Sequence, residues 1–208
     1  MGGLVRRAYN VCDWIAKVAI LNLIWLLFTL AGLVVFGIVP ATIALFTVVR
    51  KWTLSETDAP VFRVFFETFK KEFLRGNLLG LFIIAIGFFL FYDLKLVLSI
   101  SGSLQFVLGV PLLIIIGCYL LVLLYIFPVY VTFELKFLNY FKYALYMSLL
   151  NLHITIFMMI AIVLVWTLLT FLPGFIPFFG VSVIAVITMF SATGAFQRIE
   201  NKQMKYNA

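Results

Sequence analysis

Charged side chains are scarce in this sequence. Only 11% of its 208 residues are Asp, Glu, Lys or Arg, whereas 65% are hydrophobic. A soluble globular domain carries about 25% charged residues, so water cannot be the main solvent of this chain. Apolar runs long enough to cross a bilayer recur along the sequence, and this excludes a soluble domain held by a single anchor.

Cysteine and histidine are almost absent. The two cysteines, Cys12 and Cys118, form no CxxC motif, and His153 is the only histidine, so neither a disulfide framework nor a metal site is expected. The sequence contains no Walker motif, no nucleophile elbow and no HExxH. We therefore predict a protein without a catalytic site and without a cofactor, which is not an enzyme.

The first apolar run extends over 32 residues, from Val18 to Val49. As one straight helix it would be about 48 Å long, which exceeds a bilayer. Gly37 and Pro40 mark the expected break, because proline removes a backbone donor and clashes with the preceding turn. We predict a full span over 16–37, retained rather than cleaved as a signal peptide, and a half-spanning helix over 41–52.

The next segment, 60–74, is predicted to be an amphipathic helix. Its phenylalanines recur at helical spacing and its charges fall largely on the other side, which is typical of a helix lying at a membrane surface. The segment is either a packing helix beneath the bundle or a docking surface for a partner. The phenylalanines are Phe62, Phe65, Phe66, Phe69 and Phe73, and the charges are Arg63, Glu67, Lys70 and Lys71.

The remaining apolar runs predict four more spans. Pro111 and Pro128 favour a kinked or tilted helix in the second of these runs. The fold class is thus an all-α membrane protein, one domain over 1–208, with five full transmembrane helices, a half-span and an interfacial helix. The four further spans are placed at 77–98, 104–133, 143–171 and 176–196.

The basic residues indicate the orientation. The segments 50–75, 134–142 and 198–205 hold eleven Lys or Arg residues, whereas 99–103 and 173–180 carry no charge. The positive-inside rule places the basic segments, with the C-terminus, in the cytoplasm of a bacterial plasma membrane. The break at Pro40 places the N-terminus there too; a single tilted first helix would instead place it outside.

The net charge of +7 does not indicate nucleic-acid binding. The basic residues lie at the ends of apolar runs, not on one continuous face, so their expected partners are membrane lipids with acidic headgroups.

Four polar residues inside the apolar runs are candidate intramembrane sites. Asp93 needs a compensating partner, because an ionised group at the bilayer centre costs about 2.5–3.5 kcal/mol. His153, with Asn151 close to it, either bonds a neighbouring helix or contacts a proton or ligand. We expect Asn22 to bond another helix, and Gly76 and Gly80 form a GxxxG that favours tight helix packing within or between chains.

Two stretches carry a family resemblance. They are 22–52, NLIWLLFTLAGLVVFGIVPATIALFTVVRKW, and 61–81, VFRVFFETFKKEFLRGNLLGL. Here the sequence resembles the YesL family of multi-spanning bacterial membrane proteins. The resemblance covers about a third of the chain, and elsewhere only the hydrophobic layout agrees.

The resemblance implies genes that often lie beside carbohydrate-uptake ABC transporters. It leads to the hypothesis of an accessory subunit that contacts an ABC permease through the cytoplasmic segment 50–75. The alternative is an autonomous small transporter with Asp93, Asn151 and His153 along a path. The candidate contact residues are Arg50, Lys51, Arg63, Phe66, Lys70 and Lys71.

Overall fold

The computed structural model describes residues 2–56 and 59–207, and it describes the side chains of residues 6, 9, 11–56 and 59–198. All secondary structure in this part of the chain is helical. Five of its helices are long and apolar enough to cross a membrane, which confirms the predicted fold class. The elements in order are α1 (Gly2–Ala31), α2 (Ile38–Thr53), α3 (Val61–Ser99), α4 (Ser103–Thr132), α5 (Phe137–Leu150), α6 (Leu152–Phe171), the 3₁₀ turn η1 (Pro173–Phe175) and α7 (Ile176–Asn207).

The short helix α2 lies at the centre of the molecule. It packs against α1, α3, α4 and α7, and Ala41, Ala44, Leu45 and Val49 along it are fully buried. Its 16 residues make about 24 Å of helix, less than a bilayer thickness. Protein, rather than lipid, therefore surrounds most of this predicted half-span.

The break between α1 and α2 comes earlier than the predicted one. We expected the first span to reach Gly37, but α1 ends at Ala31, where the chain reverses through the left-handed backbone of Leu33 and Val34. The Val34 N–H donates to the Thr29 carbonyl at 2.9 Å. Pro40 then lies in the first turn of α2, where its missing N–H costs no helical bond.

A single helix replaces the predicted pair at 60–74 and 77–98. The 39 residues of α3 continue through Gly76 and reach about 58 Å. The boundary is absent because the glycines pack on α2: a Cβ on Gly76 would lie 2.9 Å from Ile43 Cδ1, and one on Gly80 would lie 2.6 Å from Val39 Cγ2. The GxxxG motif thus serves packing within the chain, which offsets the low helix propensity of glycine.

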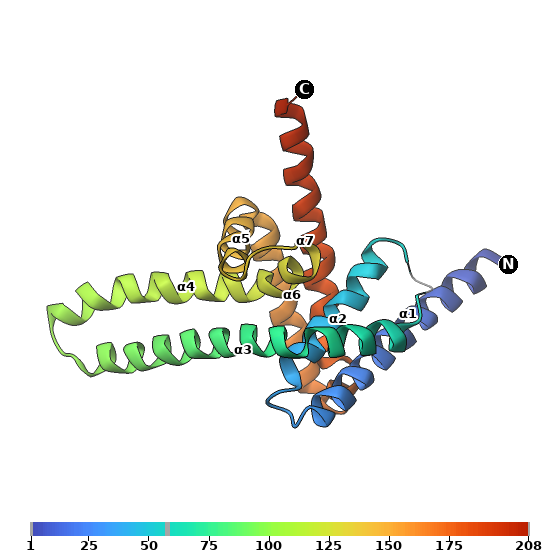
Figure 1. The fold of residues 1–208 in the computed structure, drawn as a ribbon, viewed down its shortest axis with the longest axis horizontal. Helices are drawn as coiled ribbons and strands as arrows, with labels where there is room; N and C mark the ends of the chain where they lie inside the picture. The colour runs from blue at the N-terminus through green and yellow to red at the C-terminus, as the bar shows by residue number, and fades with distance from the viewer. Residues whose placement is uncertain (1, 57–58, 208) are drawn as a thin grey trace.

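The helices α3 and α4 form a long hairpin. Figure 1 shows it projecting to one side of the molecule, in a direction that differs from that of α7. Its two arms pack on each other, with Tyr119 of α4 donating to the Ile83 carbonyl of α3 at 2.9 Å, and the second half of α4 also packs on α5 and α7. The five long helices therefore do not form one parallel bundle.

The predicted fourth span, 143–171, is two helices that meet at Asn151. This residue leaves the helical region, with φ −121° and ψ 48°. Its side-chain amide donates to the Met147 carbonyl at 3.3 Å, and Thr155 Oγ1 lies 2.9 Å from the Ser148 carbonyl oxygen. Polar side chains that bond nearby backbone compete with the helical pattern, so α5 ends at Leu150 and only α6 is a span.

Candidate functional site

The first half of α3 has one packed side and one exposed side. Phe65 is fully buried, and its ring lies 5.2 Å from that of Phe28 on α1, with the Phe69 ring at 5.1 Å on the same partner. The predicted contact residues Arg63, Phe66, Lys70 and Lys71 are instead exposed. Together with Phe62 and Leu74 they form what we call the outer face of α3.

The outer face mixes charge with aromatic surface. Phe62 and Phe66 are stacked with ring centroids 6.4 Å apart and remain about half exposed. Arg63 Nε lies 2.8 Å from Glu67 Oε1, and both side chains are more than 60% exposed. Such a surface pair contributes only about 0.3–0.5 kcal/mol, whereas the rings of Phe62 and Phe66, each with its centroid 6.0 Å from that of Phe28, also pack on α1.

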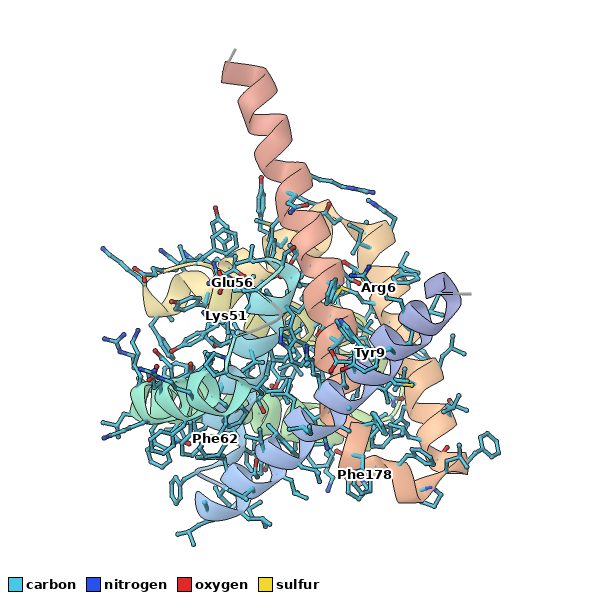
Figure 2. All side chains as sticks on the ribbon, turned by 90° about the vertical axis from the view of Figure 1, so that its right-hand side faces the viewer. Arg6, Tyr9, Lys51, Glu56, Phe62 and Phe178 are labelled. Atoms are coloured by element: carbon cyan, nitrogen blue, oxygen red, sulfur yellow. The ribbon has the colours of Figure 1, made fainter. Side chains whose placement is uncertain are left out.

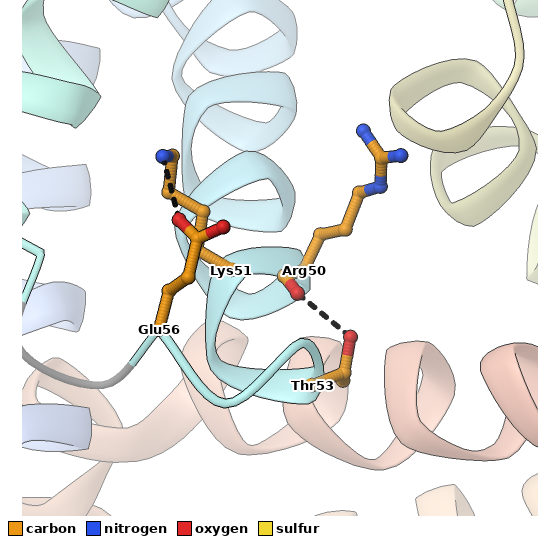
Figure 3. Close-up of polar contacts among 4 residues, drawn as sticks. All are labelled: Arg50, Lys51, Thr53 and Glu56. Carbon is orange, nitrogen blue, oxygen red and sulfur yellow. Dashed lines mark hydrogen bonds and ion pairs between the residues drawn. The ribbon is translucent and has the colours of Figure 1, made fainter.

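The basic pair at the end of α2 divides between two environments. Figure 3 shows Lys51 beside Glu56, with Nζ and Oε2 3.0 Å apart, and the Arg50 side chain extending away from them. Arg50 donates from Nη1 to the Val131 carbonyl of α4 at 2.7 Å. Lys51 therefore lies at the surface, whereas Arg50, which we expected to contact a partner, points into the molecule.

Arg50 borders a polar cavity of about 500 Å³ between the ends of α2 and α4, the first half of α3 and the start of α5. Tyr130 donates from its hydroxyl to Glu72 Oε2 at 2.7 Å across this space, and its ring packs on Tyr140 with centroids 4.8 Å apart. We refer to this space as the polar cavity. Its charged lining residues are Arg50, Lys71, Glu72, Arg75 and Glu134.

A second cavity of about 390 Å³ lies on the other side of Arg50. Arg50, Thr132 and Phe133 line both spaces, and the second is otherwise bordered by α5 and α7 residues such as Met147 and Phe196. It contains no further charged lining residue, so the charges converge on the polar cavity.

The interhelical bond expected of Asn22 is present. Its buried side chain donates from Nδ2 to the Pro177 carbonyl at 2.6 Å, and its Oδ1 accepts the N–H groups of Val181 and Ser182 at 3.0 and 2.9 Å. One amide thus joins the middle of α1 to the start of α7. Asn22 has a structural role, since all of its bonds go to backbone.

The other predicted intramembrane residues do not come together. Asp93 lines an apolar cavity between α3 and α4, and no ion pair or hydrogen bond joins it to any described residue. Asn151 is buried at the α5–α6 corner. His153 is not deep inside a span but exposed in the first turn of α6, where its Nε2 accepts from Arg198 of α7. These three residues do not line one path.

Sequence reasoning singled out Arg50 and Lys71 as partner contacts but missed the other residues that build the polar cavity. Glu72, Arg75 and Tyr130 belong to two helices and meet only because α3 is continuous and packs beside the end of α4. The available signal was the polar residues at the end of the third apolar run, where Tyr130, Glu134 and Tyr140 follow one another closely. In the described part of the chain, no group of three metal-ligating side chains is present.

Comparison with known proteins gives one family match and three relatives. The family model described as "Protein of unknown function, DUF624" matches residues 18–94. This range covers the second half of α1, all of α2 and most of α3, the part that holds Arg50 and the outer face. No solved structure matches the chain.

The relatives are three proteins of Bacillus subtilis strain 168. The uncharacterized protein YteU is 41% identical over 90% of this chain and 84% of its own length. The uncharacterized protein YesL is 36% identical over 96% of this chain and 94% of its own length, and the uncharacterized protein YesV is 37% identical over 92% of both. Such identity over nearly whole chains, with five helices able to span a membrane, shows that the chain belongs to the YesL family.

Proposed function

We propose that this chain is a non-enzymatic membrane subunit that associates with a carbohydrate-uptake ABC transporter in a bacterial plasma membrane. The outer face of α3 carries this proposal. Its basic side chains are exposed, and the rings of Phe62 and Phe66 stay about half exposed although their centroids lie 6.0 Å from that of Phe28 of α1. Exposed aromatic and arginine side chains, such as those of Phe62, Phe66 and Arg63, are enriched at protein contact surfaces.

The proposed orientation places the basic segment 50–75, which includes this face, on the cytoplasmic side. Figure 2 shows Arg6, Lys51 and Glu56 towards the end from which the C-terminal part of α7 extends, Phe178 near the lower end, and Phe62 of the outer face between Lys51 and Phe178 in height. The uncharged segments 99–103 and 173–180, the second of which includes the start of α7, then lie on the outer side. A permease would meet the outer face at the inner membrane surface.

Co-purification tests the association. The tagged chain is extracted from native membranes in mild detergent, and we expect the permease subunits of a carbohydrate ABC importer to be recovered with it. The double variant Phe66→Ala, Lys70→Ala should recover about tenfold less permease, because it removes an aromatic anchor and a charge from the outer face.

The matched control is Phe89→Ala, Lys95→Ala, which makes the same changes at exposed positions in the second half of α3. Equal loss in both variants, or a wild-type chain that repeatedly purifies alone, would contradict the proposal. Solute flux in reconstituted vesicles that is lost in Asp93→Ala or His153→Ala would favour an autonomous transporter instead.

A further inference from the structure

We propose that the polar cavity binds a phosphate ester that carries free hydroxyl groups, of the kind found in the phosphoglycerol headgroup of phosphatidylglycerol. The cavity brings five charged side chains together from α2, α3 and the segment after α4. This inference does not depend on the transporter association, because it concerns a different set of side chains from the outer face, apart from Lys71.

The basic side chains are available for an anion. Among the described residues, no carboxylate lies within ion-pair distance of Arg50, Lys71 or Arg75; the ion pairs that form involve Lys17, Lys51 and Arg63. Arg50 uses Nη1 for the Val131 carbonyl. A guanidinium has five N–H donors, so this bond fixes Arg50 while leaving donors for phosphate oxygens.

The carboxylates select for hydroxyl groups on the same ligand. Glu72 and Glu134 also line the cavity, and an ionised carboxylate only accepts hydrogen bonds. Both would repel bare phosphate, but each can accept a hydroxyl of a glycerol headgroup. Tyr130 donates to one oxygen of Glu72 at 2.7 Å and holds that carboxylate in place.

The charge balance favours a phosphodiester. Three basic and two acidic lining residues leave one positive charge in the cavity. A phosphodiester carries a single negative charge, whereas a phosphate monoester carries about 1.5 to 2 at neutral pH. The lipid headgroup therefore matches the cavity better than a soluble monoester such as glycerol 3-phosphate.

The size and position of the cavity agree with a headgroup. Its volume of about 500 Å³ lies within the range of about 300–1,000 Å³ that small-molecule sites occupy. It opens where α2 ends with the basic pair Arg50 and Lys51, which is typical of the membrane interface. Basic pockets between helices at the cytoplasmic interface are where acidic headgroups bind.

Native mass spectrometry of the full chain in detergent tests the proposal with defined lipids. The probes are phosphatidylglycerol and phosphatidylethanol, two phosphodiesters of equal charge of which only the first carries headgroup hydroxyls. We expect the wild-type chain to bind phosphatidylglycerol about tenfold more tightly. Equal binding of the two lipids would overturn the inference, and this comparison needs no variant that has to fold.

Variants locate the binding. Lys71→Gln with Arg75→Gln should lower phosphatidylglycerol affinity about tenfold, whereas the control Arg63→Gln with Lys70→Gln, which removes the same charge from the same helix outside the cavity, should leave it unchanged. Glu72→Gln with Glu134→Gln should reduce the preference for phosphatidylglycerol over phosphatidylethanol. Equal effects of the cavity and control pairs would place the lipid elsewhere and refute the site.

Soluble competitors distinguish the source of the ester. We expect neither glycerol 3-phosphate nor inorganic phosphate at millimolar concentration to displace the lipid. Displacement by glycerol 3-phosphate alone would support the cavity and identify a soluble ester as its ligand. Displacement by inorganic phosphate would overturn the assignment of hydroxyl recognition to the two carboxylates.

Discussion

The central helix α2 and the projecting half of the α3–α4 hairpin are both strongly apolar, yet their surroundings are opposite. Leu45 on α2 is 0% exposed, whereas Phe88 on α3 and Phe106 on α4 are 71% and 74% exposed. Small residues such as Ala41 and Ala44 let four helices approach α2, while the hairpin tip carries large side chains that face outward. Hydropathy thus predicts that a residue is removed from water, but it does not predict whether that residue contacts protein or lipid.

The largest difference in folding stability between the two regions is expected at Gly37, where the backbone before α2 packs directly on the backbone of α1. A Cβ on Gly37 would lie 2.4 Å from the Thr29 carbonyl oxygen, so Gly37→Leu should cost more than about 3 kcal/mol and prevent recovery of folded protein. The measurement is the yield of monodisperse protein by size-exclusion chromatography. Gly117→Leu on α4, where no atom lies within 4 Å of an added Cβ, should be recovered normally.

A smaller difference in stability is expected when a large apolar side chain is replaced by alanine in the two regions. Leu45→Ala should destabilise the fold by about 2 kcal/mol, at the low end of the range for buried leucine, because in lipid the loss is mainly packing and not transfer from water. Phe88→Ala on the hairpin should change stability by less than about 0.5 kcal/mol. Unfolding in a titration of denaturing detergent measures both, and equal destabilisation would show that the hairpin is also packed against protein.

The amide that joins α1 to α7 should have an intermediate effect. Asn22→Leu removes three hydrogen bonds, each worth about 0.6 kcal/mol in a membrane protein, so we expect a loss of about 1–2 kcal/mol. Asn139→Leu at an exposed site on α5 is the matched control in the same unfolding titration. A stable Asn22→Leu variant would mean that packing alone holds the two helices together.

The smallest effect concerns the link between the two hairpin arms. A Cβ on Gly87 would lie 2.8 Å from the Tyr119 hydroxyl, so Gly87→Ala should displace that hydroxyl from the Ile83 carbonyl at a cost of about 1 kcal/mol. Gly109→Ala places its Cβ at an ordinary 3.5 Å from Val97. Protease accessibility of the turn 100–102 should rise only in the first variant.

The sequence predicts the elements better than it predicts their connections. Apolar length located all five long helices, and the uncharged segment 99–103 marked the turn between α3 and α4. Gly76 gave no local sign that α3 continues through it, because the packing that stabilises this glycine comes from Ile43, which belongs to another helix. The corner at Asn151 was hidden for the opposite reason, since the run around it stays apolar while a few side-chain bonds end the helix.

The candidate site was predicted only in part. Exposure of Lys70 follows from helical periodicity, which is a local property, whereas the same periodicity grouped Phe66 with the buried Phe65 on the apolar side. Adjacent residues at a helix end, such as Arg50 and Lys51, point in different directions, and which one turns inward depends on whether a carbonyl such as that of Val131 lies within reach. Tertiary arrangement decides this, so the polar cavity could not be read from spacing.

Because α3 is one continuous helix, a tilt of the helix moves both of its ends. Its first half carries the outer face, its middle rests on α2 through Gly76 and Gly80, and its far end lies at Ser99. Ser99 is about 35 Å beyond Gly76 along the helix axis. A tilt of α3 by about 5° about its contact with α2 at Gly76 therefore shifts the hairpin tip by about 3 Å. A displacement of the first half of α3 is therefore transmitted to the hairpin tip without any change in secondary structure.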